Sequence, residues 1–491
     1  YLTGLLRSKG HDVFLTNSYQ AEILDKMAAF NPSVICLSTT MIVSINAMVR
    51  IIDQIRLVMP GVFIVAGGVF TLKNYMAYKG MNYESVKDLE DYNLFHSRFS
   101  KIGIDAYIAV QHGSMSLSML LKEFQKGEKA DFSQIPNLIL PDKKGFFIET
   151  KRLDENVDYD QDFTQWDYID EMPVRVPLRT SIGCPYRCSF CDFCILYPKI
   201  HLRSPESLKK ELSVVNKRLG NQVSVVHVSD DNVFINPKRV EEVSWVFESE
   251  KVSNWVGFMR ASSINESNIE MIKRSGLLMG IFGIESGDVG QLQRMKKSLK
   301  IDDQKRGIEV LDAAGISVLM SFVIGFPGEN QETIQNTATF LNNLKLSNAI
   351  TSYHMYPLNI FPLSELGDPG FREKYSLTGN GYEWKHYTMD GSDAPGFGYN
   401  LLKSVPEVPY HYYDESHFFN RGIFNLEERK KLFQLRHDLT INLIEKRSAE
   451  ERKQILQNMV RTMGFEAEKM TDTVADMFYV KEQEHFKLIR K

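Results

Sequence analysis

The chain has few cysteines and no excess of charge of either sign. Its 491 residues include five cysteines, and 58 Lys and Arg against 62 Asp and Glu give a net charge of −4. A nucleic-acid-binding surface usually brings a cluster of Lys and Arg, and the sequence has no such stripe. No apolar run is long enough to span a membrane and no signal peptide is visible. We therefore expect a cytoplasmic protein without disulfides, and with neither nucleic acid nor membrane as a partner.

Three of the cysteines stand within eight residues. Cys184, Cys188 and Cys191 have the spacing C-x-x-x-C-x-x-C. Three thiolates on one loop can hold three irons of a cubane cluster, which leaves the fourth iron open to a substrate or cofactor. A zinc site or a redox pair would have to use Cys194, but zinc usually takes a distant second pair, and a redox pair follows a strand without further cysteines before it. The fifth cysteine, Cys36, lies in an apolar run and is predicted to be a core residue.

This spacing, with Phe190 directly before the third cysteine, resembles the signature of radical S-adenosylmethionine (SAM) enzymes. In that superfamily the open iron is chelated by the amino and carboxylate groups of SAM. An electron from the cluster then splits SAM to a 5′-deoxyadenosyl radical. The resemblance implies a [4Fe-4S] cluster on the three cysteines, SAM as a cofactor, and an electron donor such as flavodoxin or ferredoxin.

Apolar runs separated by helical stretches predict a parallel sheet that is covered on both faces. The runs are 223–228, 255–260, 280–285 and 317–325. Polar residues follow them, at the strand ends where such barrels collect their functional groups. The family resemblance implies that these residues bind SAM together with Phe190: Ser229, Asp230, Asp231, Arg260, Ser262, Glu285, Ser286 and Gly325. Taken singly, Asp231 could cap a helix, Glu285 could be a turn residue, and the turn at Gly325 needs no ligand.

Residues 1–125 alternate between helix and strand, which is typical of a doubly wound, Rossmann-like domain. The expected helices are 2–9, 20–30 and 45–58, and the expected strands are 12–15, 33–38 and 62–66. The chain opens on Tyr1 within an expected helix, so we expect the first strand of the domain, and its loop, to lie outside the sequence. In some cobalamin domains that loop carries a cobalt-ligating histidine.

The run Phe282-Gly-Ile-Glu-Ser-Gly, followed by Met295-Lys-Lys and Phe326-Pro-Gly-Glu, resembles the radical SAM subgroup that has a cobalamin-binding domain in front. This resemblance implies a cobalamin site in the first domain. Its residues would be Thr16, Ser38, Thr39, Thr40, Gly67, Gly68, Val69 and His112. A generic flavodoxin-like domain would look similar, and a surface turn is the alternative role for His112.

The whole chain is predicted to be α/β, with four parts. A Rossmann-like cobalamin-binding domain at 1–125 is followed by a polar connector at 126–175, a partial (β/α)6 radical SAM barrel at 176–345, and an aromatic-rich, helical region at 346–491 that ends in an α-rich cap. Aromatic segments of the last part resemble the cobalamin-dependent subfamily that includes the phosphinate P-methyltransferases. They suggest four substrate contacts or, alternatively, a buried cover over the barrel: Tyr353, His354, Trp384 and His386. The cap has Leu432, Leu435, Leu439 and Leu443 on one helix face.

The resemblance implies methylation at an unactivated carbon or phosphorus of a small molecule, such as a natural product, or of a peptide. One SAM would methylate reduced cobalamin, and a second would yield the radical that takes a hydrogen atom from the substrate. The substrate radical would then collect the methyl group from cobalt. Two alternatives stay open: a rearrangement or cyclisation with the same cofactors, and an iron-sulfur protein that only carries electrons or binds a partner.

Overall fold

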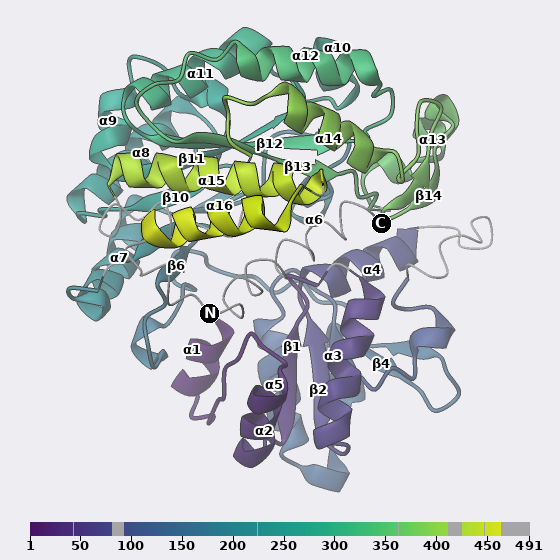
Figure 1. Ribbon diagram of the computed structural model, residues 1–491. Helices are drawn as coiled ribbons and strands as arrows, with labels where there is room; N and C mark the ends of the chain where they lie inside the picture. The colour runs from purple at the N-terminus through teal and green to yellow at the C-terminus, as the bar shows by residue number, and fades with distance from the viewer. Residues whose placement is uncertain are drawn as a thin grey trace. The chain divides into compact units, whose positions relative to one another are not determined.

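The computed structural model describes residues 1–42, 44–80, 93–222, 224–361, 363–410, 425–445 and 447–462 (Figure 1). The chain divides into two compact units. Unit 1 comprises Tyr1–Glu171 with Ile195–Tyr197, and unit 2 comprises Met172–Cys194 with the described residues from Pro198 onward. Each unit is built around its own sheet. No described helix combines the length and the apolar character that crossing a membrane requires.

Unit 1 has a five-stranded sheet in the order β1-β2-β3-β4-β5. Its strands are β1 (Val34–Ser38), β2 (Phe63–Gly67), β3 (Ala106–Ile108), β4 (Leu138–Pro141) and β5 (Phe147–Glu149). The first three are parallel, and β4 and β5 add an antiparallel hairpin. The helices are α1 (Leu2–Ser8), α2 (Ala21–Phe30), α3 (Ile45–Val58), α4 (Val69–Gly80) and α5 (Ser114–Phe124). The segment predicted to be a polar connector thus supplies the two strands at one edge of the sheet, β4 and β5.

Helix α3 shows how the sequence specifies its own packing. Ser44 caps it by accepting a hydrogen bond from the backbone N–H of Ala47 at 3.2 Å. Apolar side chains at helical spacing are buried on one face, among them Met48 and Ile52, and they pack on the side chains of the sheet. The N-cap residue and the buried apolar face therefore define the same helix, and its bounds are those that the sequence predicts.

Two expectations for unit 1 are wrong. Residues 12–15 form no strand, because β1 is the edge of the sheet and no described strand pairs with its outer side; Leu15 is 64% exposed. Cys36 is exposed rather than part of the core. Its apolar neighbours Ile35 and Leu37 point to the opposite face, where they pack on the core, since side chains alternate along a strand.

Unit 2 has a six-stranded parallel sheet in the order β13-β12-β11-β10-β9-β6. These strands are β6 (Arg175–Leu178), β9 (Val225–Val228), β10 (Trp255–Met259), β11 (Leu277–Glu285), β12 (Ser317–Ile324) and β13 (Thr351–Pro357). Two small antiparallel pairs join β7 (Ser181–Ile182) to β8 (His201–Leu202), and β14 (Thr378–Asn380) to β15 (Glu383–Lys385). The predicted α/β fold, with a parallel sheet in this part of the chain, is confirmed. Val223, which starts the first predicted run, lies outside the described residues.

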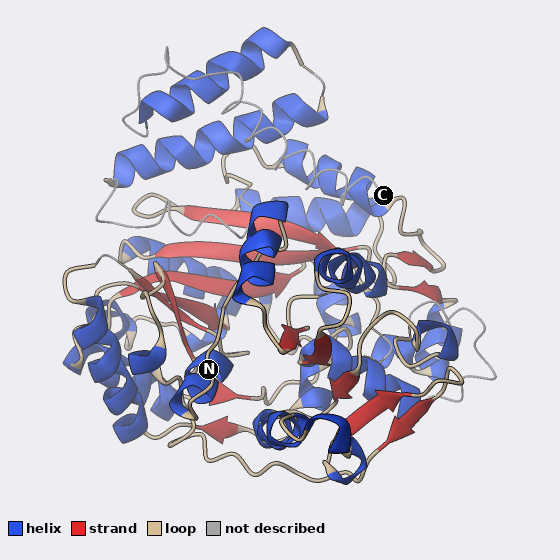
Figure 2. Ribbon diagram, turned by 90° about the horizontal axis from the view of Figure 1, so that it is seen from below, coloured by secondary structure: helices blue, strands red, loops and turns tan. Residues whose placement is uncertain are grey.

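Helices cover both faces of this sheet (Figures 1 and 2). The helices of unit 2 before the last pair are α7 (Pro205–Leu219), α8 (Pro237–Ser249), α9 (Ile269–Arg274), α10 (Val289–Arg294), α11 (Ile301–Ala313), α12 (Gln331–Asn342), α13 (Pro369–Tyr375) and α14 (Ala394–Ser404). The short helix α6 (Phe193–Leu196) begins in unit 2, and its last two residues belong to unit 1. Phe282, Met320 and Phe322 pack in the core formed with α8, α11 and α12.

The last described helices, α15 (Leu426–Ile444) and α16 (Ala449–Thr462), cover the other face of the same sheet. Leu432 and Leu439 are buried against strand side chains such as Leu319, and Leu435 is half-buried beside them. The predicted helical cap with its leucine stripe is therefore present. The side chain of Leu443 lies outside the described residues.

Candidate functional site

The three closely spaced cysteines lie on the loop between β7 and α6, and all are half-buried and unpaired. The backbone N–H groups of Tyr186 and Phe193 act to lower the pKa of the Cys184 and Cys191 thiols. The N–H of Cys191 donates to the carbonyl oxygen of Cys188 at 3.0 Å, which closes a turn. Burial raises the pKa of all three thiols, that of Cys191 to about 12. A metal ion bound to these sulfur atoms would take the place of the proton.

The donor set fits a cubane cluster better than a single ion. Within the described ranges, no three Cys, His, Asp or Glu side chains are close enough together to hold one metal ion. Mononuclear zinc needs that convergence, whereas each thiolate of a cubane cluster binds a different iron, so the ligands are spread around it. Cys194 is half-buried, and its thiol donates to the carbonyl oxygen of Cys191 at 3.6 Å.

A short segment that starts with the last residue of α10, residues 294–298, anchors the cysteine loop. The N–H of Ser189 donates to the carbonyl oxygen of Met295 at 3.0 Å, and the Ser189 hydroxyl donates to that of Arg294 at 3.3 Å. Arg260 stacks its guanidinium on the ring of Tyr186, 3.5 Å from the ring centre. The same guanidinium donates to the carbonyl oxygens of residues 297 and 298 at 2.7 and 3.0 Å. We call residues 294–298 the anchor segment.

The anchor segment also carries a buried partner for Glu285. The ammonium group of Lys297 lies 2.7 Å from Oε1 of Glu285, and the two residues are 7% and 8% exposed. Glu285, Lys296 and Ser298 have φ values of 66°, 53° and 44°, a left-handed conformation that is uncommon outside glycine. Such strain is often concentrated at functional sites. Sequence reasoning missed Lys297, although the Met295-Lys-Lys motif contains it.

The carboxylates after β9 lock the start of the cysteine loop. Asp230 is buried and accepts hydrogen bonds from the N–H of Thr180 at 2.7 Å and from the hydroxyls of Thr180 and Ser181. Asp231 accepts from the N–H of Gly183 at 3.1 Å. Burial raises the pKa of Asp231, and the Gly183 N–H opposes that increase. Both carboxylates therefore hold the backbone just before the first cysteine.

The other predicted residues in this region differ in exposure. Ser229 is half-buried, and its N–H donates to the carbonyl oxygen of Leu178 at 2.8 Å, whereas Ser262 is exposed. The sequence interpretation also missed Asn232. This residue is 2% exposed, and neither polar atom of its side chain has a hydrogen-bond partner. The only sequence signal was its place directly after the two aspartates.

The turn after β12 is built around Gly325, which has a φ of 94°. Its N–H donates to the carboxyl group of Glu329, and burial raises the pKa of Glu329 to about 8. His386 donates through Nε2 to the Gly325 carbonyl oxygen at 3.0 Å. The ring of Trp384 stacks on His386 with centroids 5.1 Å apart. Two residues predicted to contact substrate thus support this turn.

Nearby side chains occupy the core rather than the surface. Phe190 is half-buried, with its ring 6.5 Å from that of Phe326 in the same turn. Ser286 is buried, and its hydroxyl accepts from the N–H of Asp288 at 3.1 Å. Both residues therefore pack beside the turn and α10.

Tyr353 and His354 point to opposite faces of β13, as neighbours on a strand must. Tyr353 is fully buried and packs edge-on against Phe322 and Tyr410, with centroids 6.2 and 5.7 Å away. His354 is buried on the other face, where its Nε2 shares a hydrogen bond with the hydroxyl of Ser321.

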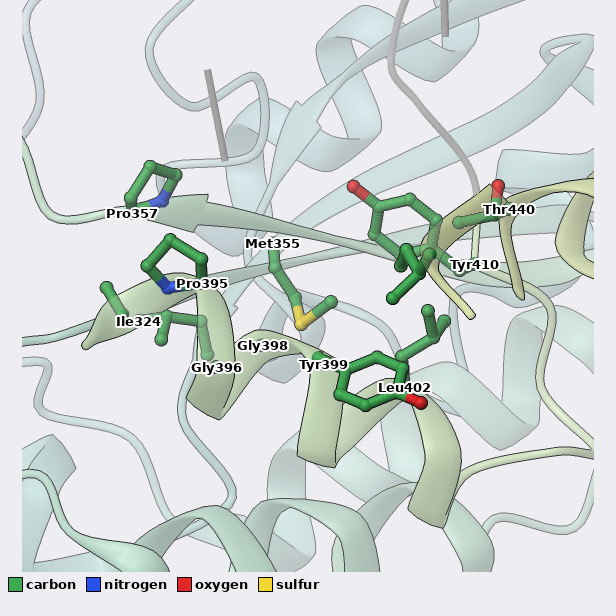
Figure 3. Close-up of a pocket in the computed structure, with 12 residues that line it drawn as sticks. Ile324, Met355, Pro357, Pro395, Gly396, Gly398, Tyr399, Leu402, Tyr410 and Thr440 are labelled. Atoms are coloured by element: carbon green, nitrogen blue, oxygen red, sulfur yellow. The ribbon is translucent and has the colours of Figure 1, made fainter. Parts of the chain in front are cut away.

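A largely apolar cavity of about 360 Å³ lies beside the end of β12 (Figure 3). Strands β12 and β13 contribute Ile324, Met355 and Pro357, and helix α14 contributes residues including Tyr399 and Leu402. None of the cysteines or predicted SAM residues lines it. It has the lining of a pocket for an apolar group.

In unit 1 the predicted cobalamin residues follow β1 and β2. Because the two strands are parallel, their carboxyl ends lie at one edge of the sheet, where ligands bind in open α/β folds. Ser38 and Thr40 are exposed there, with hydroxyls 3.4 Å apart. Thr39 is buried, and its hydroxyl donates to the carbonyl oxygen of Gly67 at 3.0 Å and accepts from the N–H of Thr71.

Gly68 leaves no room for a side chain. Its φ is 116°, and a Cβ would lie 2.9 Å from the hydroxyl oxygen of Thr40. This bare backbone between exposed hydroxyls fits the close approach of a nucleotide tail. Val69 is half-buried and begins α4.

His112 and Thr16 lie on other loops of unit 1. His112 is half-buried between β3 and α5, and its Nε2 shares a hydrogen bond with the hydroxyl of Tyr159. Since β3 is parallel to β2, the two strands end at the same edge of the sheet. His112 and Gly68 each lie on the chain that leaves this edge. Thr16 is exposed between α1 and α2, and its hydroxyl donates to the carbonyl oxygen of Ser18 at 3.1 Å.

Comparison with protein families agrees with this division. The model of the radical SAM superfamily matches residues 178–341, and that of the B12 binding domain matches residues 1–83. The chain is 27% identical over 222 residues to an uncharacterized methyltransferase of Pyrococcus horikoshii, a match that covers 45% of this chain and 46% of the relative. It is 22% identical over 249 residues to an anaerobic magnesium-protoporphyrin IX monomethyl ester cyclase of Rubrivivax gelatinosus, covering 48% and 44%. The chain thus spans less than half the length of these relatives.

Two solved structures share the fold. The radical S-adenosylmethionine methyltransferase TsrM of Kitasatospora setae, with tryptophan substrate and a SAM analog bound, has a TM-score of 0.55 at 14% identity; the match covers 82% of this chain and 84% of that one. The cobalamin-dependent S-adenosylmethionine radical enzyme OxsB, with aqua-cobalamin and S-adenosylmethionine bound, has a TM-score of 0.56 at 15% identity, covering 95% and 73%. At these identities the likeness concerns the fold.

Proposed function

We propose, from the premise that this chain is a radical SAM enzyme with a cobalamin-binding domain, that it transfers a methyl group to an unactivated carbon or phosphorus. Its cofactors are a [4Fe-4S] cluster, SAM and cobalamin. The observation that carries the proposal is the presence of both cofactor domains in a chain whose relatives include methyltransferases. The substrate would be a small molecule or a peptide, and the electron donor a flavodoxin or ferredoxin.

When bound, the cluster with SAM supplies a radical that removes a hydrogen atom, and cobalamin supplies a carrier for the methyl group. The protein has to position these groups and exclude water. We assign the cluster to Cys184, Cys188 and Cys191. The N–H groups of Tyr186 and Phe193 would stabilise negative charge on two of the sulfur atoms.

For SAM, we assign direct contacts to the polar groups at the ends of β9 to β12. Asp231, Glu285 and Arg260 are buried or half-buried charges there, and they could pair with the amino and carboxylate groups of SAM. Asp230 already binds Thr180, so we assign it the support of the loop. The remaining predicted residues would form the walls of the site: Phe190, Ser229, Ser262, Ser286 and Gly325.

For cobalamin, we assign the nucleotide tail to the exposed hydroxyls of Ser38 and Thr40 and to the backbone at Gly67 and Gly68. Thr39 would hold these loops together, since its hydroxyl bridges the end of β2 and the start of α4. Thr16, Val69 and His112 would be peripheral contacts.

The decisive experiment needs no knowledge of the substrate. The protein is purified without oxygen from cells supplied with cobalamin, and about one cobalt for every four irons per chain is expected. It is then reduced and incubated with SAM that carries a deuterated methyl group. We expect the deuterated methyl group on protein-bound cobalamin by mass spectrometry, and deoxyadenosine by chromatography. Iron without cobalt, or cobalamin that never acquires the label, would sink the methylation proposal.

A second candidate function is a cyclisation or rearrangement with the same cofactors, favoured by the similarity to the cyclase of Rubrivivax gelatinosus. That reaction would release deoxyadenosine together with methionine that keeps the methyl label, and no label would reach cobalamin. The same experiment therefore separates the two candidates.

A further inference from the structure

Three buried charged side chains lie beside the cysteine loop. Arg260, Glu285 and Lys297 are 6%, 8% and 7% exposed, and they come from the ends of two adjacent strands and from the anchor segment. Burying charge is costly unless the charges are paired or stabilise something else. We call these residues the charge trio.

The charge trio is connected internally and to the cysteine loop. Lys297 pairs with Glu285 at 2.7 Å, and Arg260 donates to the backbone carbonyl of Lys297 at 2.7 Å. Arg260 stacks on Tyr186, which stands between two of the cysteines. The anchor segment also holds the loop through Ser189. The charges are therefore fixed relative to the sulfur atoms.

The trio has one more positive charge than negative charge. Glu285 neutralises Lys297, and no carboxylate among the described residues forms an ion pair with Arg260 within 4.0 Å. The stack of Arg260 on Tyr186 and the hydrogen bonds of the anchor segment hold the trio beside the cysteine loop. Charge at the trio thus acts electrostatically on the position where we place the cluster.

We propose that the net charge of Arg260, Glu285 and Lys297 sets the reduction potential of the cluster. A [4Fe-4S] cluster with three thiolate ligands is anionic, and the electron that it accepts from an external one-electron donor adds negative charge without forming or breaking a bond. Nearby positive charge favours the reduced state, and local net charge is one of the factors that tune such potentials. This proposal rests on the assignment of the three cysteines as ligands.

The alternative is that the trio only packs the site or contacts SAM. Either role would leave the potential of the SAM-free cluster independent of the sign of the trio's charge. A charge effect instead predicts opposite shifts when a negative or a positive member is neutralised. The charge trio allows both changes, because Glu285 is negative and Arg260 and Lys297 are positive.

The test is an anaerobic redox titration of the reconstituted full chain without SAM, followed by electron paramagnetic resonance. Glu285→Gln should raise the potential, and Arg260→Gln should lower it. We expect at least a tenfold change in the ratio of reduced to oxidised cluster at a fixed potential, which for one electron corresponds to about 59 mV. The double variant Glu285→Gln/Lys297→Met restores the trio's net charge and should return close to the wild-type value.

Arg260→Lys is the matched control, because it keeps the charge and loses the planar stack on Tyr186. We expect its potential to stay near that of the wild type. Shifts of the same direction in Glu285→Gln and Arg260→Gln, or equal potentials in all variants, would refute the charge effect. Iron and sulfide are measured in every sample, so a wild-type chain without a cluster contradicts the ligand assignment. If one single variant fails to fold, the other single variant still tests the direction of the shift, and a double variant that departs from the wild-type potential refutes the charge effect.

Discussion

His386 donates a hydrogen bond from Nε2 to the carbonyl oxygen of Gly325, 3.0 Å away, across 61 residues of sequence. Its Nδ1 faces the hydroxyl of Thr388 at 3.0 Å, which donates to it and fixes the tautomer. The imidazole is 3% exposed and stacks on Trp384. These contacts make His386 a support of the turn that closes β12.

We expect His386→Phe to destabilise the protein by about 1–3 kcal/mol, because the buried carbonyl of Gly325 loses its donor. The measurement is chemical denaturation, with Tyr387→Phe as the control, since Tyr387 is 57% exposed. Equal stability of the two variants would contradict a supporting role for the imidazole.

Gly325→Ala and Gly315→Ala separate backbone strain from steric clash. Both glycines have positive φ values, 94° and 74°. A Cβ at Gly315 meets nothing within 4 Å, whereas at Gly325 it would lie 2.6 Å from Cζ2 of Trp384. Gly315→Ala should cost about 1 kcal/mol of unfolding free energy, and Gly325→Ala at least about 2 kcal/mol more. Similar losses would show that Trp384 moves aside freely.

In unit 1, Gly68→Ala should reduce cobalamin retention severalfold and lower stability by about 1–3 kcal/mol. The added Cβ would press on Thr39 and Thr40, 2.9–3.2 Å away, while the backbone is held at a positive φ. Gly61→Ala is the control, because a Cβ there has open space. Bound cobalamin is measured by its visible absorbance after gel filtration. Retention that is unchanged in Gly68→Ala would argue against a nucleotide tail at this loop.

Glu329 predicts a pH dependence of stability. Burial raises its pKa from 4.5 to about 8 in the folded protein. Between these values the unfolded state binds fewer protons than the folded state, so the free energy of unfolding falls as pH rises from about 4.5 to 8. Glu329→Gln keeps an acceptor for the Gly325 N–H and should flatten this decline in denaturation curves between pH 5 and 8. Glu332→Gln, an exposed neighbour, should leave the decline as it is in the wild type.

Cys188→Ala should abolish the cluster and the cleavage of SAM, because the remaining two thiolates cannot hold three irons. Cys194→Ala is the matched control on the same stretch of chain and should keep both. Iron, sulfide and visible absorbance of the reconstituted proteins are the measurements. A cluster lost from the Cys194 variant would show that the ligand set extends beyond the three-cysteine motif.

Local patterns predicted the framework because each is decided by neighbouring residues. The apolar residues of α3 recur at helical spacing, so they lie on one face of the helix, and the three cysteines lie within a loop of eight residues. The strand predicted at 12–15 failed for a non-local reason, since a strand exists only when another strand pairs with it. The prediction that Cys36 is a core residue failed for a similar reason, because an apolar run does not reveal which face of its strand is covered.

The sequence by itself determined the α/β class and the three-cysteine motif, both of which depend on residue spacing along the chain, and the order of the two cofactor domains followed from its resemblance to known families. Only the tertiary structure decided that Lys297 is the buried partner of Glu285, and that Trp384 and His386 support the Gly325 turn. The physical reason is that charge pairing and stacking depend on distance in space. Chain folding brings residues 61 positions apart within 3.0 Å, and no periodicity in the sequence records that contact.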